Sequence, residues 1–349
     1  MPNDFGNRIT ANALKADKAE ELIQRALKYV ETTHGYYPAE EKPLFSGVYY
    51  DSQKVGSYIV RVENSKKETA VLKLQLQPLP YDEGFIIREV QKKVHGRVRP
   101  VAVFYDKPWN ENLNFGYLIF EDLSKIPDLW QSFPTKVTDR EQHGYFLKTF
   151  REQLLPVEPW IKKPTVSLSV LVGEAFDHFF EIANKSAHHH IDNNEVDKYI
   201  EKYKQLIKKT DFIEMEFTHG HLSGKDVKYD QSTGQFFLMA NLYWSWRPKY
   251  YDLVFPIWVD LMQLRQADLT FDEFLARIND WLVIWQKNFG SDLKLEVFWW
   301  LMLDRAMSTI MLDLGASEWL PPELAEKTAL LKVWQKLFEW IVENKMTES

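Results

Sequence analysis

The spacing of the apolar residues changes near position 123, and this change constrains the fold more than any other feature of the sequence. Between residues 44 and 123, apolar and polar residues alternate in short runs, which is typical of β-strands. After residue 123 the apolar residues mostly recur every three or four positions, which is typical of amphipathic helices. The sequence therefore predicts an α+β chain with a small sheet-containing lobe and a larger, mainly helical lobe.

The small lobe, residues 44–123, is predicted to hold an antiparallel sheet of five strands and one helix. The expected order is three strands, the helix and two further strands. The strands are expected at 46–50, 57–62, 69–76, 101–105 and 115–120, with the helix over about 85–94. Residues 1–43 form an N-terminal extension whose helix begins near Asp17. Its apolar residues share one face, so we expect it to pack on a lobe rather than to bind a partner.

The helical lobe, residues 124–349, is interrupted by a polar loop. Helices are expected at 139–154, 168–186, 194–209, 253–266, 271–288, 293–313 and 322–344. Between them, residues 217–241 place His, Ser, Lys and Asp side chains between two short apolar runs. Loops fixed in this way between rigid elements commonly carry function. This segment is therefore the first candidate for a site.

Charge and composition limit the classes of function. The net charge is −7 and no dense basic stripe is present, which argues against nucleic acid as the main partner. The chain has no cysteine, so disulfides and thiolate chemistry are excluded. The N-terminus lacks the pattern of a signal peptide, and the most apolar stretch, 297–303, is too short to span a bilayer. We therefore expect a cytoplasmic protein with no membrane partner.

The polar loop resembles the catalytic loop of the aminoglycoside phosphotransferases and choline kinases, which have the two-lobed protein-kinase-like fold. That loop reads His-Gly-Asp-Leu-His-x-x-Asn in the family. Here His219, Gly220 and Leu222 match it. Downstream, residues 247–253 match the family's Pro-x-Tyr-Asp-Leu element. The resemblance covers about residues 44–310, and it implies a phosphotransferase that uses ATP and Mg²⁺ on a small hydroxyl-bearing molecule.

The resemblance also implies nucleotide-binding residues in the small lobe. Lys73, in the third predicted strand, takes the place of the lysine that neutralises nucleotide phosphates. Glu89, on the following helix, matches the glutamate that orients this lysine. Residues 118–123, with Glu121, resemble the segment whose backbone binds the edge of adenine. Considered alone, Lys73 could equally be a surface lysine and Glu89 a solvated helix residue.

The positions that carry the family's chemistry are changed in this chain. His221 stands where the catalytic aspartate belongs, Asp226 where the metal-binding asparagine belongs, and Asn241 where the metal-binding aspartate belongs. The two metal positions still offer one carboxylate and one amide, which are oxygen ligands that suit Mg²⁺. The resemblance implies that His219 orients the loop and that Asp252 braces it.

Two functions remain open after these substitutions. A neutral histidine at position 221 can accept a hydrogen bond from an acceptor hydroxyl, and phosphoryl transfer depends more on positioning and charge than on a strong base. A phosphotransferase of weak or altered activity is thus allowed. The alternative is an inactive pseudokinase that serves as a nucleotide-binding or regulatory module. The loop between the first strands, residues 51–56, has one glycine and is a poor match to a phosphate-covering loop.

Overall fold

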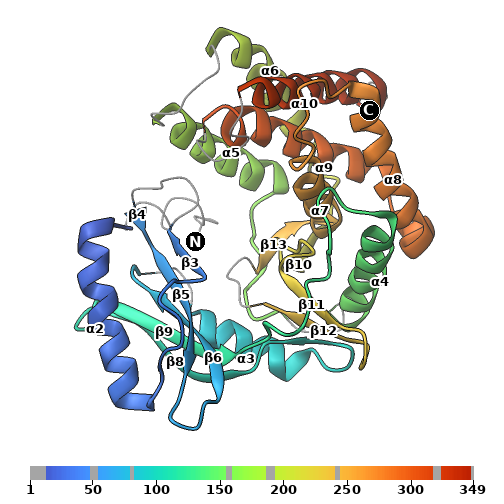
Figure 1. Cartoon of the computed structure of the whole chain (residues 1–349). Coiled ribbons are helices and arrows are strands. Elements are labelled where there is room, and N and C mark those ends of the chain that lie inside the picture. Colours follow the sequence, from blue (N-terminus) through green and yellow to red (C-terminus); the bar gives the residue numbers. More distant parts are fainter. Residues whose placement is uncertain are drawn as a thin grey trace. The chain divides into compact units, whose positions relative to one another are not determined.

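The computed structural model describes residues 13–47, 54–78, 82–154, 159–185, 193–239, 244–316 and 324–346, which form two compact units. The sheet unit comprises the described residues of segments 4–127 and 228–242. The helical unit comprises those of segments 128–227 and 243–349. Both units can be followed by their labelled elements in Figure 1. A sheet-containing part and a mainly helical part confirm the predicted α+β class.

The sheet unit is built on a six-stranded antiparallel sheet with the order β2-β5-β6-β9-β8 and with β3 paired to β5. The strands are β2 (Tyr37–Pro38), β3 (Phe45–Gly47), β5 (Ser57–Glu63), β6 (Thr69–Gln75), β8 (Val103–Asn110) and β9 (Phe115–Glu121). One strand more than the predicted five is present because Tyr37–Pro38 also pairs with β5. Residues 48–50 of the first predicted strand lie outside the described residues.

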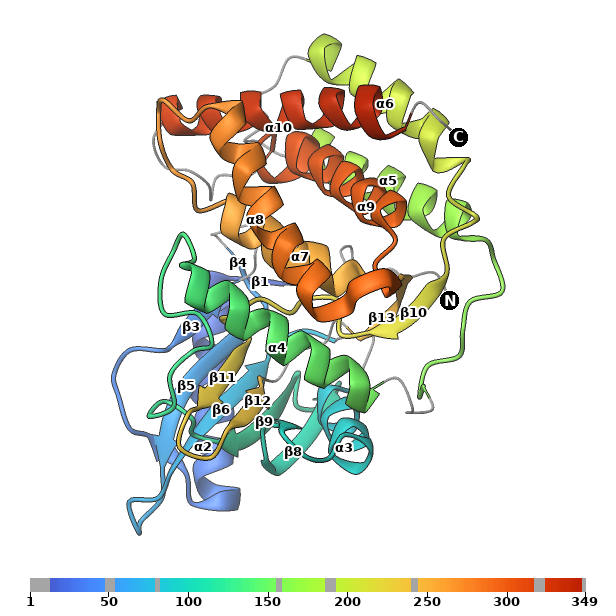
Figure 2. The ribbon, with the colours of Figure 1, turned by 90° about the vertical axis from the view of Figure 1, so that its right-hand side faces the viewer.

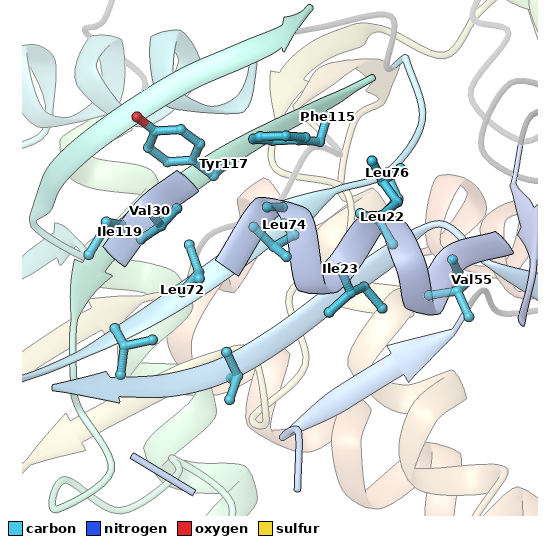
Figure 3. Packing of buried hydrophobic residues seen from close by; sticks show 14 of the residues in the cluster. Leu22, Ile23, Val30, Val55, Leu72, Leu74, Leu76, Phe115, Tyr117 and Ile119 are labelled. Atoms are coloured by element: carbon cyan, nitrogen blue, oxygen red, sulfur yellow. The ribbon is translucent and has the colours of Figure 1, made fainter. Parts of the chain in front are cut away.

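Two helices of the sheet unit pack on opposite faces of strand β6. Leu72 and Leu74 belong to a buried cluster with residues of helix α2 (Ala16–His34), and Figure 3 shows this packing around Leu22, Ile23 and Val30. Val71 belongs to a second cluster, which includes Ile87 of helix α3 (Glu83–Lys93). Because successive strand residues point to opposite faces, Val71, Lys73 and Gln75 share the face of α3. The predicted packing of the N-terminal helix on a lobe is confirmed.

Each unit also contains smaller strand groups. In the sheet unit, β12 (Gln235–Leu238) lies between β11 (Val227–Asp230) and β7 (Val98–Pro100), and β1 (Leu14–Lys15) pairs with β4 (Lys54–Val55). In the helical unit, β10 (Met215–Thr218) pairs antiparallel with β13 (Ser245–Pro248). Strand β10 leads into the polar loop and β13 leads into helix α7, so this pair positions both.

The helical unit is held together by long helices around a core rich in tryptophan. They are α4 (Val137–Leu154), α5 (Leu168–Lys185), α6 (Asn193–Ile207), α7 (Tyr251–Leu261), α8 (Phe271–Phe289), α9 (Leu295–Ser308) and α10 (Leu324–Lys345), with the short η1 (Gly290–Asp292) and the π-helical turn η2 (Thr309–Asp313). Figure 2 shows α7 to α10 in one view. Trp281, Trp285 and Trp300 are buried in this core. Among the described residues, no helix is long and apolar enough to cross a membrane.

Candidate functional site

A buried ion pair joins the central strand of the sheet unit to its helix. The Lys73 Nζ lies 2.7 Å from Oε1 of Glu83, the first residue of α3. The Glu83 side chain is fully buried, and its other oxygen accepts a hydrogen bond from Gln75 Nε2 at 3.3 Å. A buried carboxylate needs partners of this kind because leaving water is costly for a charge. The pair fixes the Lys73 ammonium on the α3 face of the sheet.

The structure corrects the predicted partner of Lys73, which is Glu83 and not Glu89. Helix α3 begins at Glu83 directly after Asp82, whose side chain accepts a hydrogen bond from Phe85 N, so its first turn faces strand β6. At about 100° per residue, Glu89 lies about 120° around the helix axis from Glu83 and so on another face. Its carboxylate instead accepts a hydrogen bond from Lys92 Nζ at 2.8 Å, and this bond lowers the pKa of Glu89.

Glu121, predicted at the adenine edge, is held by internal contacts at the end of β9. Its two carboxylate oxygens accept bonds from Arg99 Nη1 and Nη2 at 2.6 and 2.9 Å. Oε1 also accepts from Ala102 N, and the Glu121 N–H donates to the Ala102 carbonyl. These contacts secure the strand end. A nucleotide contact at Glu121 stays a prediction. It would have to use groups other than the Glu121 carboxylate and N–H, which already form hydrogen bonds within the sheet unit.

In the helical unit, a buried carboxylate braces the start of the polar loop. Asp252, in the first turn of α7, accepts hydrogen bonds from the Thr218 hydroxyl and, at 2.8 Å, from the Gly220 N–H. Burial raises the pKa of Asp252 to about 6, although the Thr218 bond acts in the opposite direction. These contacts are those expected of the bracing residue that the sequence predicts.

Gly220 meets two requirements that only glycine fulfils without strain. Its φ is +74°, in the left-handed region. A Cβ built on it would lie 2.1 Å from Nε of Arg247, so the guanidinium lies directly against the loop backbone. Farther along, Gly224 packs in the same way on the ring of Trp130, and its carbonyl accepts from Trp130 N at 3.2 Å. Residues 220–224 of the loop are therefore held at both ends by contacts within the helical unit.

His219 is a buried member of the loop's framework. Its side chain is almost inaccessible, and its ring meets Trp244 edge-on at 5.1 Å between centroids. Burial lowers its pKa to about 3, so the imidazole is neutral at ordinary pH. No hydrogen-bond partner of its Nδ1 is found among the described residues. This environment suits positioning of the loop better than proton transfer.

His221 and Asp226 lie together on the more exposed part of the loop. The His221 ring packs on Phe255 with centroids 4.3 Å apart, and its Nδ1 lies 3.6 Å from Oδ2 of Asp226. The same Oδ2 accepts hydrogen bonds from Ser223 N at 2.9 Å and Ser223 Oγ at 2.6 Å. Burial by itself would raise the pKa of Asp226, but His221 and Ser223 together lower it. The sequence did not single out Ser223 as a partner of Asp226.

A metal at this loop would have few protein ligands. Asn241, the second predicted ligand, lies outside the described residues. Within the described part of the chain, no group of three or more His, Asp or Glu side chains could hold a metal ion. Mg²⁺ in phosphotransferases is commonly held by one or two protein oxygens together with substrate phosphates. Asp226 fits that role through Oδ1, since the hydrogen bonds from Ser223 fall on Oδ2.

The arrangement of elements is similar to that of several solved structures. The first is an aminoglycoside phosphotransferase, APH(4)-Ia, in a ternary complex with ADP and hygromycin B. It covers 90% of this chain and 97% of its own, with a TM-score of 0.59 and 11% identity. The chain has the fold of the small-molecule phosphotransferases. The predicted protein-kinase-like fold is thus confirmed.

Two further solved structures, both of small-molecule kinases, are also similar to this chain in fold. The amicoumacin kinase hAmiN, in complex with AMP-PNP, Ca²⁺ and Ami, has a TM-score of 0.54 and 11% identity over 95% of this chain and 98% of its own. The choline kinase LicA from Streptococcus pneumoniae has a TM-score of 0.51 and 10% identity over 92% and 99%. No protein-family model and no curated protein matches the sequence itself. The likeness therefore shows the fold, and the chemistry depends on this chain's own residues.

Proposed function

We propose that this protein is a phosphotransferase that uses ATP and Mg²⁺ to phosphorylate a hydroxyl group of a small molecule. The observation that carries the proposal is that His221 Nδ1 lies 3.6 Å from the Asp226 carboxylate, close enough for electrostatic attraction, on a loop braced by Asp252. The buried Lys73–Glu83 pair supports it, because it presents a fixed ammonium for nucleotide phosphates. The structural neighbours that contain ADP or AMP-PNP support the choice of an adenine nucleotide.

His221 would act on the acceptor hydroxyl. The negative charge of Asp226 near Nδ1 favours the tautomer that carries its proton on Nδ1, and the lone pair on Nε2 is then the acceptor. A histidine oriented by a carboxylate is a common means of activating a hydroxyl. In the transfer, the acceptor oxygen forms a bond to the γ-phosphorus and the bond to the β–γ bridging oxygen breaks. ADP leaves, and the hydroxyl proton passes to His221 Nε2.

The remaining residues would hold the phosphates and the loop. Lys73 would bind the nucleotide phosphates while Glu83 fixes its position. Asp226 and, as a prediction outside the described residues, Asn241 would bind Mg²⁺. When bound, Mg²⁺ supplies positive charge that neutralises the phosphates. Asp252 would keep Gly220 in its left-handed conformation and so set the direction of His221.

One observation favours the inactive alternative, a nucleotide-binding or regulatory pseudokinase. The Asp226 oxygen nearest to His221 already accepts two hydrogen bonds from Ser223, so part of the carboxylate is used within the loop. If this closed arrangement persists with nucleotide bound, Asp226 serves the loop rather than a metal. The two functions therefore differ in whether Mg²⁺ changes the binding of ATP.

A thermal-shift titration with ATP, with and without Mg²⁺, separates these functions. The phosphotransferase proposal predicts a rise in melting temperature that needs Mg²⁺, is lost in Lys73→Met and is weakened in Asp226→Ala. A rise that is independent of Mg²⁺ and unchanged in Asp226→Ala would favour the pseudokinase. The absence of any rise would overturn both nucleotide-binding functions and leave a regulatory or scaffold role. Because phosphoryl transfer depends on positioning and charge more than on base strength, and because aspartate is the residue that the resemblance implies at this position, His221→Asp should also raise the rate of ATP turnover.

A further inference from the structure

Arg247 is a half-buried arginine beside the polar loop that has no ion pair among the described residues. In the β10–β13 ladder it stands directly opposite Glu216, a position at which opposite charges commonly pair. The Glu216 carboxylate instead lies 2.7 Å from Arg151 Nη1. The nearby Lys249 likewise has a carboxylate partner, Glu214, at 2.9 Å. Arg247 thus differs from the cations around it.

A second arginine shares an aromatic ring with Arg247. The guanidinium carbon of Arg247 lies 4.5 Å from the centre of the Tyr251 ring, and that of Arg305 lies 5.6 Å from the same centre. Arg305 Nη2 also donates a hydrogen bond of 2.7 Å to the Tyr251 hydroxyl. Two guanidinium groups on one ring form a concentration of positive charge with several N–H donors, which suits carboxylate or phosphate oxygens.

This pair lies close to the residue proposed to receive the acceptor hydroxyl. Tyr251 and Phe255 are one turn apart on α7, and His221 packs on Phe255. Arg305 also lies over Phe255, at 5.3 Å. Successive turns of a helix are about 5.4 Å apart. Both arginines and His221 therefore lie around the two neighbouring rings of Tyr251 and Phe255.

We propose that Arg247 and Arg305 bind an anionic group of the acceptor, a carboxylate or a phosphate, and so place its hydroxyl at His221. The inference rests on the proposed function for the role of His221 and extends it by naming the substrate class. Arg247 would be a specificity-determining residue. Its position against Gly220 ties recognition of the anion to the loop that carries the proposed chemistry.

Two carboxyl groups near Arg305 would favour a cationic acceptor over an anionic one. Asp304 accepts a hydrogen bond from the Tyr203 hydroxyl, and Asp313 lies in the turn η2. Burial raises the pKa of both, that of Asp313 to about 6, while Arg305 lowers both. Arg247 also lowers the pKa of Asp304 and that of Asp252, so these carboxyl groups act on both arginines. None of them forms an ion pair with Arg247 among the described residues, and the choice of an anion therefore depends on Arg247.

Four compounds on one three-carbon skeleton test the charge preference: glycerate, glycerol 3-phosphate, glycerol and 3-aminopropane-1,2-diol. Their binding is measured by ligand-observed NMR, with and without AMP-PNP and Mg²⁺. We expect one or both anions to bind at least about tenfold more tightly than glycerol, the range expected for charge-assisted hydrogen bonds. The two anions distinguish a carboxylate from a phosphate. Tighter binding of the amine, or no preference for either anion over glycerol, would overturn the proposal.

Variants of Arg247 test whether this residue forms the anion-binding site. Arg247→Gln should remove the preference for the anion, while Arg247→Lys should keep part of it. Lys249→Gln is the matched control, since it removes the same charge two residues away and leaves Arg247 in place. Urea unfolding of each variant shows whether the fold is intact. An anion preference that survives in a folded Arg247→Gln variant would contradict the assignment.

The same experiment separates this inference from the proposed function. Arg247-dependent binding of an anion by a protein that neither binds nor turns over ATP would support the anion site and overturn the phosphotransferase. Turnover of ATP together with a preference for the amine would support the phosphotransferase and overturn the anion site.

Discussion

The two halves of the polar loop differ in how firmly their side chains are held. In the first half, Thr218 and Gly220 both donate hydrogen bonds to Asp252, and His219 is buried beside them. In the second half, the His221 side chain is 37% exposed and its closest carboxylate oxygen is 3.6 Å away, beyond normal hydrogen-bond length. The first half matches the family's sequence and the second departs from it. We therefore expect the first half to set the shape of the loop and the second half to set its chemistry.

Helix α3 also has one side chain that is buried in an ion pair, Glu83, and one that pairs near the surface, Glu89. Their comparison gives the largest expected change in stability. Glu83→Gln breaks a buried ion pair with Lys73 and should lower the free energy of unfolding by about 3–5 kcal/mol. Glu89→Gln, on the same helix, should leave it unchanged within error. Urea denaturation of both variants measures the difference. An equal loss of unfolding free energy in both variants, or a larger loss in Glu89→Gln, would indicate that Glu89 is the residue that orients Lys73.

Within the loop, removing the brace should cost much more stability than removing the reactive residue. Asp252→Ala leaves the Thr218 hydroxyl and the Gly220 N–H without their buried acceptor, which should lower the free energy of unfolding by about 3–4 kcal/mol. His221→Ala should lower it by less than about 1 kcal/mol. The two unfolding curves are compared at pH 7. Similar losses of unfolding free energy in Asp252→Ala and His221→Ala would contradict the claim that the first half of the loop is held more firmly than the second.

The pH dependence of stability tests the brace directly. The folded pKa of Asp252, about 6, lies above the ordinary value of 3.8, so the folded state holds this proton more tightly. Its contribution is complete below about pH 4 and is lost as the pH rises through 6, an effect of about 3 kcal/mol. The stability of Asp252→Asn relative to the wild type should therefore increase over this range. Subtracting the two curves cancels the opposite contribution of His219, whose pKa is lowered. A flat difference would contradict the assigned burial of the Asp252 carboxyl.

The contact between Gly220 and Arg247 gives the smallest effect. Gly220→Ala places a side chain at positive φ and against the Arg247 guanidinium, which should lower the free energy of unfolding by about 1–3 kcal/mol. Adding Arg247→Ala should recover the part due to the contact and leave about 1 kcal/mol of backbone strain. Thermal unfolding of the single and double variants shows the recovery. A fully additive double variant would mean that the two residues do not touch.

Much of the fold could be predicted because it depends on local periodicity. The alternation in 57–62 and 69–76 and the helical spacing after residue 123 correspond to β5, β6 and the long helices. The strand made by Tyr37–Pro38 was missed, since two residues carry no period and pair only through the register of β5.

The candidate site was less predictable because it depends on the direction in which side chains point. The order of strand and helix predicted a glutamate for Lys73. Only the start of α3 at Glu83 decides which turn faces the strand. Nothing in the sequence singled out Arg247. Its lack of an ion pair depends on the three-dimensional structure, in which Glu216 pairs with Arg151 and not with Arg247 opposite it.

The central claim is that the altered loop still transfers phosphate, and phosphorus-31 NMR of ATP with Mg²⁺ tests it most directly. Water can stand in for an unknown acceptor, so ADP should form even without one. The account predicts that wild-type protein produces ADP faster than Lys73→Met and Asp226→Ala. With an added acceptor, the phosphomonoester and inorganic phosphate should together equal the ADP formed. ATP that stays intact at the rate of the Lys73→Met control would contradict it.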